Sequence, residues 1–131
     1  MALKPQHTFV KNFSGDRKEA TMLLYAPIGL DNEGNGISGE RFANEIYSMQ
    51  DMGVENIKVR INSPGGNVMD GFSIFSAITN AKCNVETFID GMAASIAGII
   101  AMAGKRVHMA DIGMLMIHDP SMDGDAPQTA K

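Results

Sequence analysis

The sequence predicts an α/β fold built around a mostly parallel sheet. One observation predicts the fold class, and a second predicts the number of domains. Segments with a strand pattern alternate with segments of helical spacing along the chain, and such an alternation is typical of parallel strands joined by right-handed crossovers. The 131 residues, 44% of them apolar, also suit one core and argue against disorder. We therefore expect a single domain without internal repeats.

The chain is expected to enter this sheet through an N-terminal hairpin, residues 7–25. The first strand of the hairpin alternates, with Phe9 and Phe13 as candidate inward positions. Turn residues follow at 14–17, and residues 20–25 are rich in apolar side chains, as in a second strand.

The first helix is predicted after a loop rich in glycine and asparagine, residues 27–36. Ser38 can cap the N-terminus of this helix, because serine oxygens accept hydrogen bonds from the unpaired N–H groups there. Phe42, Ile46 and Met49 recur at helical spacing and predict the buried stripe.

The next strand is predicted over residues 56–61, which place Ile57, Val59 and Ile61 on one face. Residues 62–67, Asn-Ser-Pro-Gly-Gly-Asn, break this strand sharply. A second helix follows. Its apolar residues are Val68, Phe72, Phe75 and Ile78, with Met69 nearby.

A further strand is predicted over residues 85–89, with a turn at residues 90–91. Helical spacing begins at Ile96. Two short apolar strands, over residues 106–109 and 114–117, complete the alternation.

Sulfur-containing residues are interpreted as structural. Cys83 is the single cysteine, so the chain cannot form an internal disulfide, and a reducing compartment is expected. The spacing of cysteine and histidine is not that of a metal site. Methionine is abundant, with 11 residues, and most are interpreted as adaptable core fillers rather than ligands. These are Met49, Met52, Met69, Met102, Met114 and Met116.

Composition also excludes several classes of partner. The formal net charge is -4 and no basic run exists, which argues against a nucleic-acid partner. The longest uncharged apolar run, residues 91–104, is too short to span a bilayer, so no membrane partner is expected. The loop that contains the glycine pair at 65–66, called the glycine loop below, lacks the Lys-Ser/Thr pair of a phosphate-binding loop. Ala93 and Ala97 replace the glycines of a Gly-x-Ser-x-Gly elbow.

Ser95 is the first candidate functional residue, because it lies where a strand ends and a helix begins. Unpaired N–H groups and the positive end of the dipole at a helix N-terminus favour developing negative charge. A serine in this place can therefore act as a nucleophile. A structural interpretation is also open, in which the helix packs tightly and needs a small side chain.

A serine nucleophile needs a base and an oxyanion hole, and the sequence offers a candidate for each. His118 follows the last strand and is the candidate base. His7 lies near the terminus and His108 lies within a strand, so both fit less well. The two glycines at 65–66 leave backbone N–H groups uncovered, and the Ile96 N–H is the natural second donor.

The glycine loop, Ser95 and His118 each follow the carboxyl end of a predicted strand. Ligands of parallel sheets bind at this edge, so the three elements meet if their strands are neighbours. Taken singly, a tight turn explains the glycines, and a hydrogen-bonded position at the edge of the core explains the histidine. The joint placement of all three favours the catalytic interpretation.

Three motifs carry a more specific signal. They are Ile61-Asn62-Ser63-Pro64-Gly65-Gly66, Gly91-Met92-Ala93-Ala94-Ser95 and Met116-Ile117-His118-Asp119-Pro120. In this order they resemble the proteolytic subunit of the Clp protease, the caseinolytic serine peptidase family, and most of all its phage and prophage branch, which is linked with head maturation. The resemblance covers about residues 20–120.

The resemblance implies a Clp/crotonase-type βα superhelical fold and gives each candidate residue a role. Ser95 would be the nucleophile and His118 the general base. The N–H groups of Gly66 and Ile96 would form the oxyanion hole. The substrate-binding positions, which would flank an extended substrate by strand addition, are Gly65, Asn67, Val68 and Pro120.

The resemblance further implies a serine endopeptidase that hydrolyses peptide bonds of unfolded or phage-scaffold-like proteins through an acyl-enzyme. The expected partners are the polypeptide substrate, further copies of the chain in a homo-oligomeric ring, and an ATPase unfoldase. No cofactor and no metal are expected. The expected location is the cytoplasm of a bacterium or of a phage-infected cell.

The chain departs from the family in the third triad member, an aspartate well downstream of the histidine, which no residue here matches. Asp119, Asp123 and Asp125 follow His118 closely, but the family motif gives none of them that role. Either the chain is a fragment of a longer protein or the triad is incomplete. We therefore expect a Clp protease-like domain over residues 1–118, a polar, mobile tail over residues 119–131 that begins a missing helix, and weak activity from these residues alone. Two alternatives stay open: a non-catalytic ring-forming paralogue, and an acyl-CoA-binding enzyme of the crotonase type.

Overall fold

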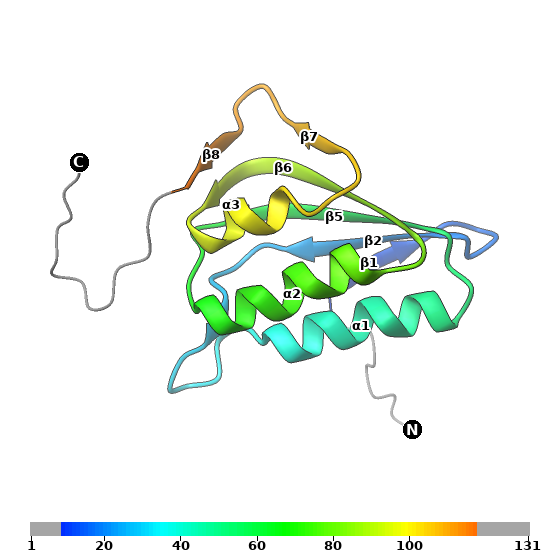
Figure 1. Cartoon of the computed structure of the whole chain (residues 1–131), viewed down its shortest axis with the longest axis horizontal. Helices are drawn as coiled ribbons and strands as arrows, with labels where there is room; N and C mark the ends of the chain where they lie inside the picture. Colours follow the sequence, from blue (N-terminus) through cyan, green and yellow to red (C-terminus); the bar gives the residue numbers. More distant parts are fainter. Residues whose placement is uncertain (1–8, 118–131) are drawn as a thin grey trace, which may run out of the picture.

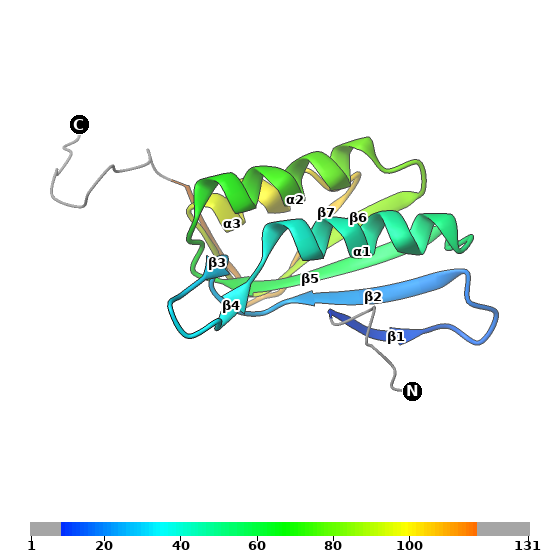
Figure 2. The ribbon, with the colours of Figure 1, turned by 90° about the horizontal axis from the view of Figure 1, so that it is seen from below.

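The computed structural model describes residues 9–117 and shows a layered α/β fold (Figures 1 and 2). Its elements in chain order are β1 (Val10–Phe13), β2 (Glu19–Leu24), β3 (Gly29–Leu30), β4 (Gly36–Ile37), α1 (Gly39–Asp51), β5 (Asn56–Ser63), α2 (Val68–Asn80), β6 (Asn84–Ala94), α3 (Ile96–Ala101), β7 (Val107–Met109) and β8 (Met114–Met116). Residues 1–8 and 118–131, and with them the predicted tail, lie outside the described residues.

The main sheet is mostly parallel, as predicted. Its six strands have the order β1-β2-β5-β6-β7, and β8 pairs with β6 off this path. β2, β5 and β6 are parallel neighbours, and β7 and β8 both run parallel to β6. β1 pairs with β2 in the antiparallel sense, with Phe13 opposite Ala20, so the predicted hairpin is present.

The hydrophobic core lies between this sheet and the helices, which cover one of its faces (Figure 2). The predicted stripe of α1, Phe42, Ile46 and Met49, is fully buried. Ser38 caps α1 as expected, because its Oγ accepts a hydrogen bond of 3.2 Å from the Arg41 N–H. No helix within residues 9–117 is long and apolar enough to cross a membrane.

Helix α2 has the predicted position but turns a different face inward. Its buried residues are Gly71, Ile74, Ala77 and Ile78. Phe72 and Met69, which the pattern placed on the apolar stripe, are 48% and 71% exposed. The reason is close contact with α3, since a Cβ at Gly71 would lie 2.2 Å from Cγ1 of Ile96. Gly71, the smallest residue of α2, therefore packs against α3.

The interpretation of the methionines as core fillers is wrong for five of the six residues. Met49 is buried, but the other five are between 45% and 71% exposed. Met52 and Met102 stand at the C-terminal caps of α1 and α3. Met114 and Met116 belong to β8, whose three residues are all exposed.

The turn predicted at residues 90–91 is also wrong, because β6 continues through it to Ala94. β6 carries a bulge there. Ile61 of β5 pairs with Ile89, and Ser63 pairs with Ala93, so two residues of β5 advance against four of β6. The bulge extends the strand to the junction with α3.

The loop predicted over residues 27–36 contains a short antiparallel ribbon of β3 and β4, which no sequence pattern indicated. Ile28, just before the ribbon, forms a bridge with Gly66. The ribbon is thereby fixed to the glycine loop after β5.

Candidate active site

Ser95 stands between the last residue of β6 and the first residue of α3, as predicted. Its φ is 59° and its ψ is −128°. Arg17 is the other non-glycine residue with a positive φ in the described part of the chain. Such conformations cost about 1–3 kcal/mol and persist where the surrounding structure enforces them. Here the Ser95 carbonyl accepts hydrogen bonds from the N–H groups of Gly98 (2.9 Å) and Ile99 (3.4 Å), so α3 begins directly at this residue.

The Ser95 side chain is available for chemistry. Its hydroxyl does not cap α3 and makes no hydrogen bond to any residue within the range 9–117. The residue is half-buried. A nucleophile needs an accessible hydroxyl whose proton a base can take, and Ser95 meets the first condition.

The end of β8 lies beside the serine. The Ser95 N–H donates a hydrogen bond of 2.7 Å to the Met116 carbonyl. A Cβ at Gly98 would lie 3.0 Å from Cγ1 of Ile117, so only a very small residue fits beneath the strand end. His118 and Pro120, the candidate base and a candidate substrate contact, follow this strand in the sequence but lie outside the described residues.

The glycine loop lies against Ser95, as expected for strands that are neighbours. A Cβ at Gly65 would lie 2.6 Å from the Ala94 carbonyl oxygen and 2.8 Å from Cβ of Ser95. Gly65 has a φ of 95°, which is a conformation that favours glycine. No residue with a side chain can occupy this position without displacing the junction.

Backbone hydrogen bonds fix the shape of the loop. The Gly65 N–H donates to Oγ of Ser63 at 3.1 Å. The Gly65 carbonyl accepts from the Ile28 N–H at 2.9 Å, and the Ile28 carbonyl accepts from the Asn67 N–H at 2.8 Å. A Cβ at Gly66 would lie 2.1 Å from the Ile28 carbonyl oxygen, so glycine is required there as well.

Two backbone N–H groups at this junction have no hydrogen-bond acceptor within the described residues. Neither the Gly66 N–H nor the Ile96 N–H has an acceptor among the residues that the structure describes. One comes from the loop that touches Ser95, and the other belongs to the residue directly after it. An oxyanion hole requires hydrogen-bond donors next to the nucleophile, and these two N–H groups are candidates for that role.

Two of the predicted substrate-binding residues also have structural roles. Asn67 caps α2, because its Oδ1 accepts a hydrogen bond of 2.8 Å from the Asp70 N–H. Val68 is the first residue of α2 and is half-buried. Contact between these residues and a substrate remains a prediction.

Sequence reasoning missed two side chains that shape the junction. Oδ1 of Asn62 accepts a hydrogen bond of 3.0 Å from the Met92 N–H and lies against Gly91, where a Cβ would be 2.6 Å away. Asn62 therefore fills the bulge of β6. Ser63 is 1% exposed and holds the Gly65 N–H. The available signal was a pair of polar residues at the end of an otherwise apolar strand.

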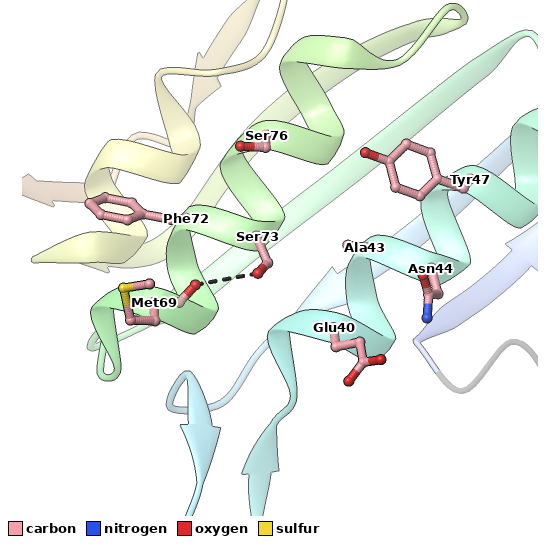
Figure 3. A pocket seen from close by; sticks show the side chains of 8 residues that line it. All are labelled: Glu40, Ala43, Asn44, Tyr47, Met69, Phe72, Ser73 and Ser76. Carbon is pink, nitrogen blue, oxygen red and sulfur yellow. Dashed lines mark hydrogen bonds between the residues drawn. The ribbon is translucent and has the colours of Figure 1, made fainter.

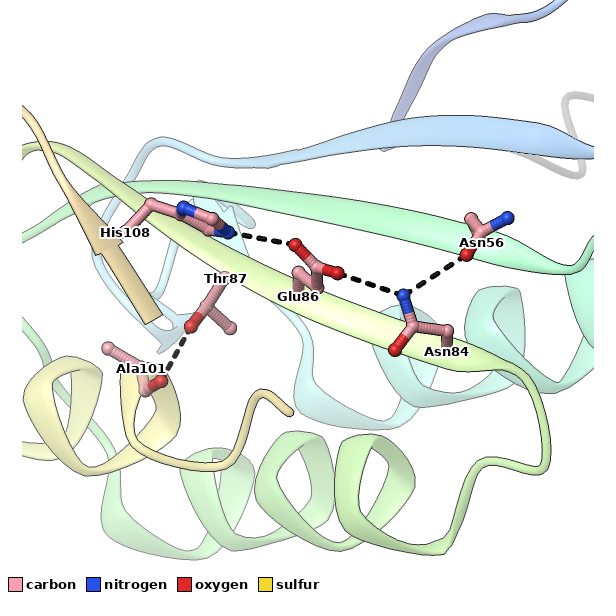
Figure 4. A network of polar contacts seen from close by, with 6 residues as sticks. All are labelled: Asn56, Asn84, Glu86, Thr87, Ala101 and His108. Carbon is pink, nitrogen blue, oxygen red and sulfur yellow. Dashed lines mark hydrogen bonds and ion pairs between the residues drawn. The ribbon is translucent and has the colours of Figure 1, made fainter. Parts of the chain in front are cut away.

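His108 is engaged elsewhere, as Figure 4 shows. Its Nε2 lies 2.8 Å from Oε1 of Glu86. Its ring also stacks on Phe88, with 4.2 Å between the ring centres. Hydrogen bonds from Asn84 and then from His108 hold the pKa of the Glu86 carboxyl below its ordinary value. These contacts hold the His108 ring against Glu86 and Phe88.

A charged cluster holds the bulge of β6 in place. Nε and one terminal nitrogen of Arg60 lie 2.8 and 2.9 Å from the two carboxylate oxygens of Asp90. Tyr25 donates its hydroxyl hydrogen bond to the same carboxylate. Arg60 first, and Tyr25 second, hold the pKa of Asp90 below its ordinary value.

A separate hollow of about 410 Å³ lies between α1 and α2 (Figure 3). It is lined by Glu40, Ala43, Asn44, Tyr47, Met69, Phe72, Ser73 and Ser76. Its lining includes two serines but no histidine, and the Ser73 hydroxyl donates within α2 to the Met69 carbonyl. Within residues 9–117, no three side chains of His, Cys, Asp or Glu are grouped so that they could hold a metal ion. The Ser95 junction is therefore the better candidate for chemistry.

Comparison with known proteins points to one family. The family model of the Clp protease matches residues 19–130. An ATP-dependent Clp protease proteolytic subunit from Cyanophora paradoxa is 32% identical over 109 residues, which cover 81% of this chain and 54% of the relative. The ATP-dependent Clp protease proteolytic subunit 2 from Prochlorococcus marinus subsp. pastoris is 31% identical over 116 residues, which cover 81% of this chain and 57% of the relative. The chain therefore spans about half the length of these curated relatives.

Solved structures agree in fold. A mutant of ClpP1 from Listeria monocytogenes is similar with a TM-score of 0.67 and 24% identity, over 79% of this chain and 58% of the other. ClpP1 from the same organism gives a TM-score of 0.55 and 26% identity, over 64% of this chain and 46% of the other. The likeness confirms the predicted Clp/crotonase-type α/β fold.

Proposed function

The chain belongs to the Clp protease family, and from this premise we propose that it acts as a serine-type endopeptidase. One observation carries the proposal. Within residues 9–117, the Ser95 hydroxyl on the strained strand-to-helix junction has no hydrogen-bond partner, and it lies beside two N–H donors without an acceptor, those of Gly66 and Ile96. This combination supplies a nucleophile and a place for the negative charge that develops during acyl transfer.

In the proposed reaction, Oγ of Ser95 attacks the carbonyl carbon of the scissile peptide while His118 takes the hydroxyl proton. The carbonyl oxygen becomes an oxyanion that accepts hydrogen bonds from Gly66 and Ile96. His118 then gives the proton to the leaving amine, which leaves an acyl-enzyme on Ser95. Water hydrolyses the ester by the same steps and restores the serine.

We propose that the substrate is an extended polypeptide, either unfolded or of the phage-scaffold type. Segments 66–68 and 120–122 would flank it by strand addition, with Gly65, Asn67, Val68 and Pro120 as contacts. The requirement for an extended backbone follows from the use of main-chain hydrogen bonds. The four relatives named above are not phage proteins by name, and the phage branch stays part of this proposal.

We further propose a homo-oligomeric ring and an ATPase unfoldase as partners, in the cytoplasm of a bacterium or a phage-infected cell. Both curated relatives are named as subunits of an ATP-dependent protease, which supports this part of the proposal. The resemblance assigns the family's triad position to no aspartate of this sequence. A histidine without an orienting carboxylate can take the wrong tautomer, so we propose weak activity for these 131 residues alone.

The test is cleavage of a fluorogenic peptide by the wild type and by Ser95→Ala. We expect the wild type to cleave, and Ser95→Ala to lose all cleavage while keeping its circular dichroism spectrum. Cleavage by Ser95→Ala at the wild-type rate would remove Ser95 from the mechanism. A folded wild type that cleaves nothing would favour a ring-forming paralogue, and binding of coenzyme A would favour the crotonase-type alternative.

A further inference from the structure

Ser63 is a buried hydroxyl that the proposed reaction does not use directly. It ends β5 and is 1% exposed. Its Oγ accepts the hydrogen bond of the Gly65 N–H, two residues along the chain. From this contact we propose that Ser63 is a positioning residue of the oxyanion hole, which selects the Gly66 N–H as the donor of the glycine loop. The inference rests on the proposed function of the Ser95 site.

The other N–H groups of the loop are either absent or already hydrogen-bonded. Pro64 has no N–H to offer. The Gly65 N–H is occupied by Ser63, and the Asn67 N–H is occupied by the Ile28 carbonyl. Among the N–H groups of residues 64–67, the Gly66 N–H alone lacks an acceptor in the described part of the chain.

The position of Gly65 makes this selection matter for the chemistry. Gly65 is buried and in contact with the junction, since its added Cβ would meet both the Ala94 carbonyl and Cβ of Ser95. A buried N–H without a partner is unfavourable, so the loop would rotate to recover a hydrogen bond if Ser63 lost its oxygen. Rotation of the Gly65 peptide changes the direction of the next N–H, that of Gly66.

Thr87 provides a matched control. It is the other fully buried hydroxyl of the sheet, and it donates a hydrogen bond of 2.6 Å to the Ala101 carbonyl, away from the glycine loop (Figure 4). Thr87→Val removes a buried hydrogen bond at similar volume. Its loss of stability should resemble that of Ser63→Ala, but it should leave the oxyanion hole unchanged.

The experiment compares Ser63→Ala, Ser63→Thr and Thr87→Val in the full chain. Amide hydrogen exchange by NMR reads the Gly65 N–H without any need for activity. The ratio of kcat to KM for a fluorogenic peptide, and the affinity for a peptide boronate that forms a tetrahedral adduct with a serine, read the oxyanion hole. Misplacement of a catalytic group by about 1 Å can cost about a hundredfold in rate.

For Ser63→Ala we expect faster exchange at Gly65, a fall of kcat of about a hundredfold with KM nearly unchanged, and a matching loss of boronate affinity. Ser63→Thr keeps the hydroxyl and should restore all three. Thr87→Val should change none of them.

Unchanged exchange at Gly65 in Ser63→Ala would overturn the positioning role, whether or not the chain is a peptidase. Faster exchange with unchanged kcat and boronate affinity would overturn it too. A wild type that neither cleaves peptides nor binds the boronate refutes the proposed function, and with it the role of Ser63 in catalysis, while the exchange data still report the hydrogen bond.

Discussion

The backbone at Ser95 holds a conformation that serine rarely adopts, and this conformation joins β6 to α3 without a loop. The junction brings the hydroxyl and the first free N–H of the helix onto adjacent residues. Strain of this kind is expected at a functional site, where the surrounding structure enforces it. The strain can be measured separately from the chemistry.

We expect Ser95→Gly to be more stable than Ser95→Ala by about 1 kcal/mol, because glycine adopts a positive φ without the steric cost that alanine has. Both variants lack the hydroxyl, so neither should be active. Urea unfolding of the two variants gives the difference in the free energy of unfolding. An alanine variant as stable as the glycine variant would show that residue 95 is not strained in solution.

Substitution of Gly66 tests the oxyanion hole. A side chain at Gly66 would collide with the Ile28 carbonyl, so Gly66→Val should displace the loop and its N–H. The loss of one oxyanion donor costs about 2.7–4 kcal/mol of transition-state stabilisation, or about 10²–10³ in kcat. Steady-state kinetics on a fluorogenic peptide measure the loss.

Gly53→Val is the control for this experiment. Gly53 also has a positive φ, 94°, but apart from its chain neighbours no described residue has an atom within 4 Å of its added Cβ. The control should lose stability and keep its kcat. A normal kcat in Gly66→Val would exclude the loop from the mechanism.

Sequence reasoning located Ser95 and the glycine pair because strand ends and paired glycines are local features. The structure brings these residues together, and the two candidate donors have no acceptor among residues 9–117. Ser63 was not identified, because its role depends on burial and on a hydrogen bond within the turn. A serine before proline and glycine looks the same in an ordinary exposed turn.

At the scale of elements, the bulge of β6 decides where the serine lies. It adds length to the strand between Ile89 and Ala93, and the Asn62 side chain fills it from β5. Residues 90–91 have the composition of a turn, and a local pattern cannot reveal a partner 30 residues away. For the same reason, helical spacing predicted α2 correctly but not its buried face, which the contact of Gly71 with α3 determines.

The Arg60–Asp90 pair should make stability depend on pH. The pKa of Asp90 lies below its ordinary value of 3.8, so the stabilisation is fully present above that value and is lost as the pH falls through the lower, folded-state pKa. Asp90→Asn should therefore cost about 1 kcal/mol at about pH 7, a modest figure because Arg60 is partly exposed. At about pH 2 the difference should fade.

Urea unfolding at both pH values measures this effect, with Asp111→Asn, an exposed carboxylate in the β7–β8 turn, as the control. A difference between wild type and Asp90→Asn that persists in acid would mean that the ion pair contributes nothing through its charge. Equal stability at neutral pH would lead to the same conclusion.

At the scale of the whole molecule, the alternation of strands and helices predicted the parallel sheet, because crossover topology follows from the order of elements. The exposure of individual apolar side chains was harder to predict. The edge formed by β7 and β8 carries large apolar side chains that composition would place inside, and they are about 40–80% exposed. They are Val107, Met109, Ile112, Met114, Leu115, Met116 and Ile117.

An exposed apolar surface of this kind favours association. We expect the wild-type chain to form species larger than a monomer, in line with the proposed ring. Light scattering over a dilution series measures the mass. A monomer at every concentration would contradict the proposed assembly of this chain.

Covalent labelling by a fluorophosphonate, followed by mass spectrometry of the digested chain, tests most directly whether Ser95 is an activated nucleophile. The reagent forms a bond between its phosphorus and an activated serine oxygen and releases fluoride. We predict one adduct, on the peptide that contains Ser95, with no adduct in Ser95→Ala and slower labelling in Gly66→Val. An adduct on a different serine, or a folded wild type that is not labelled at all, would contradict this prediction.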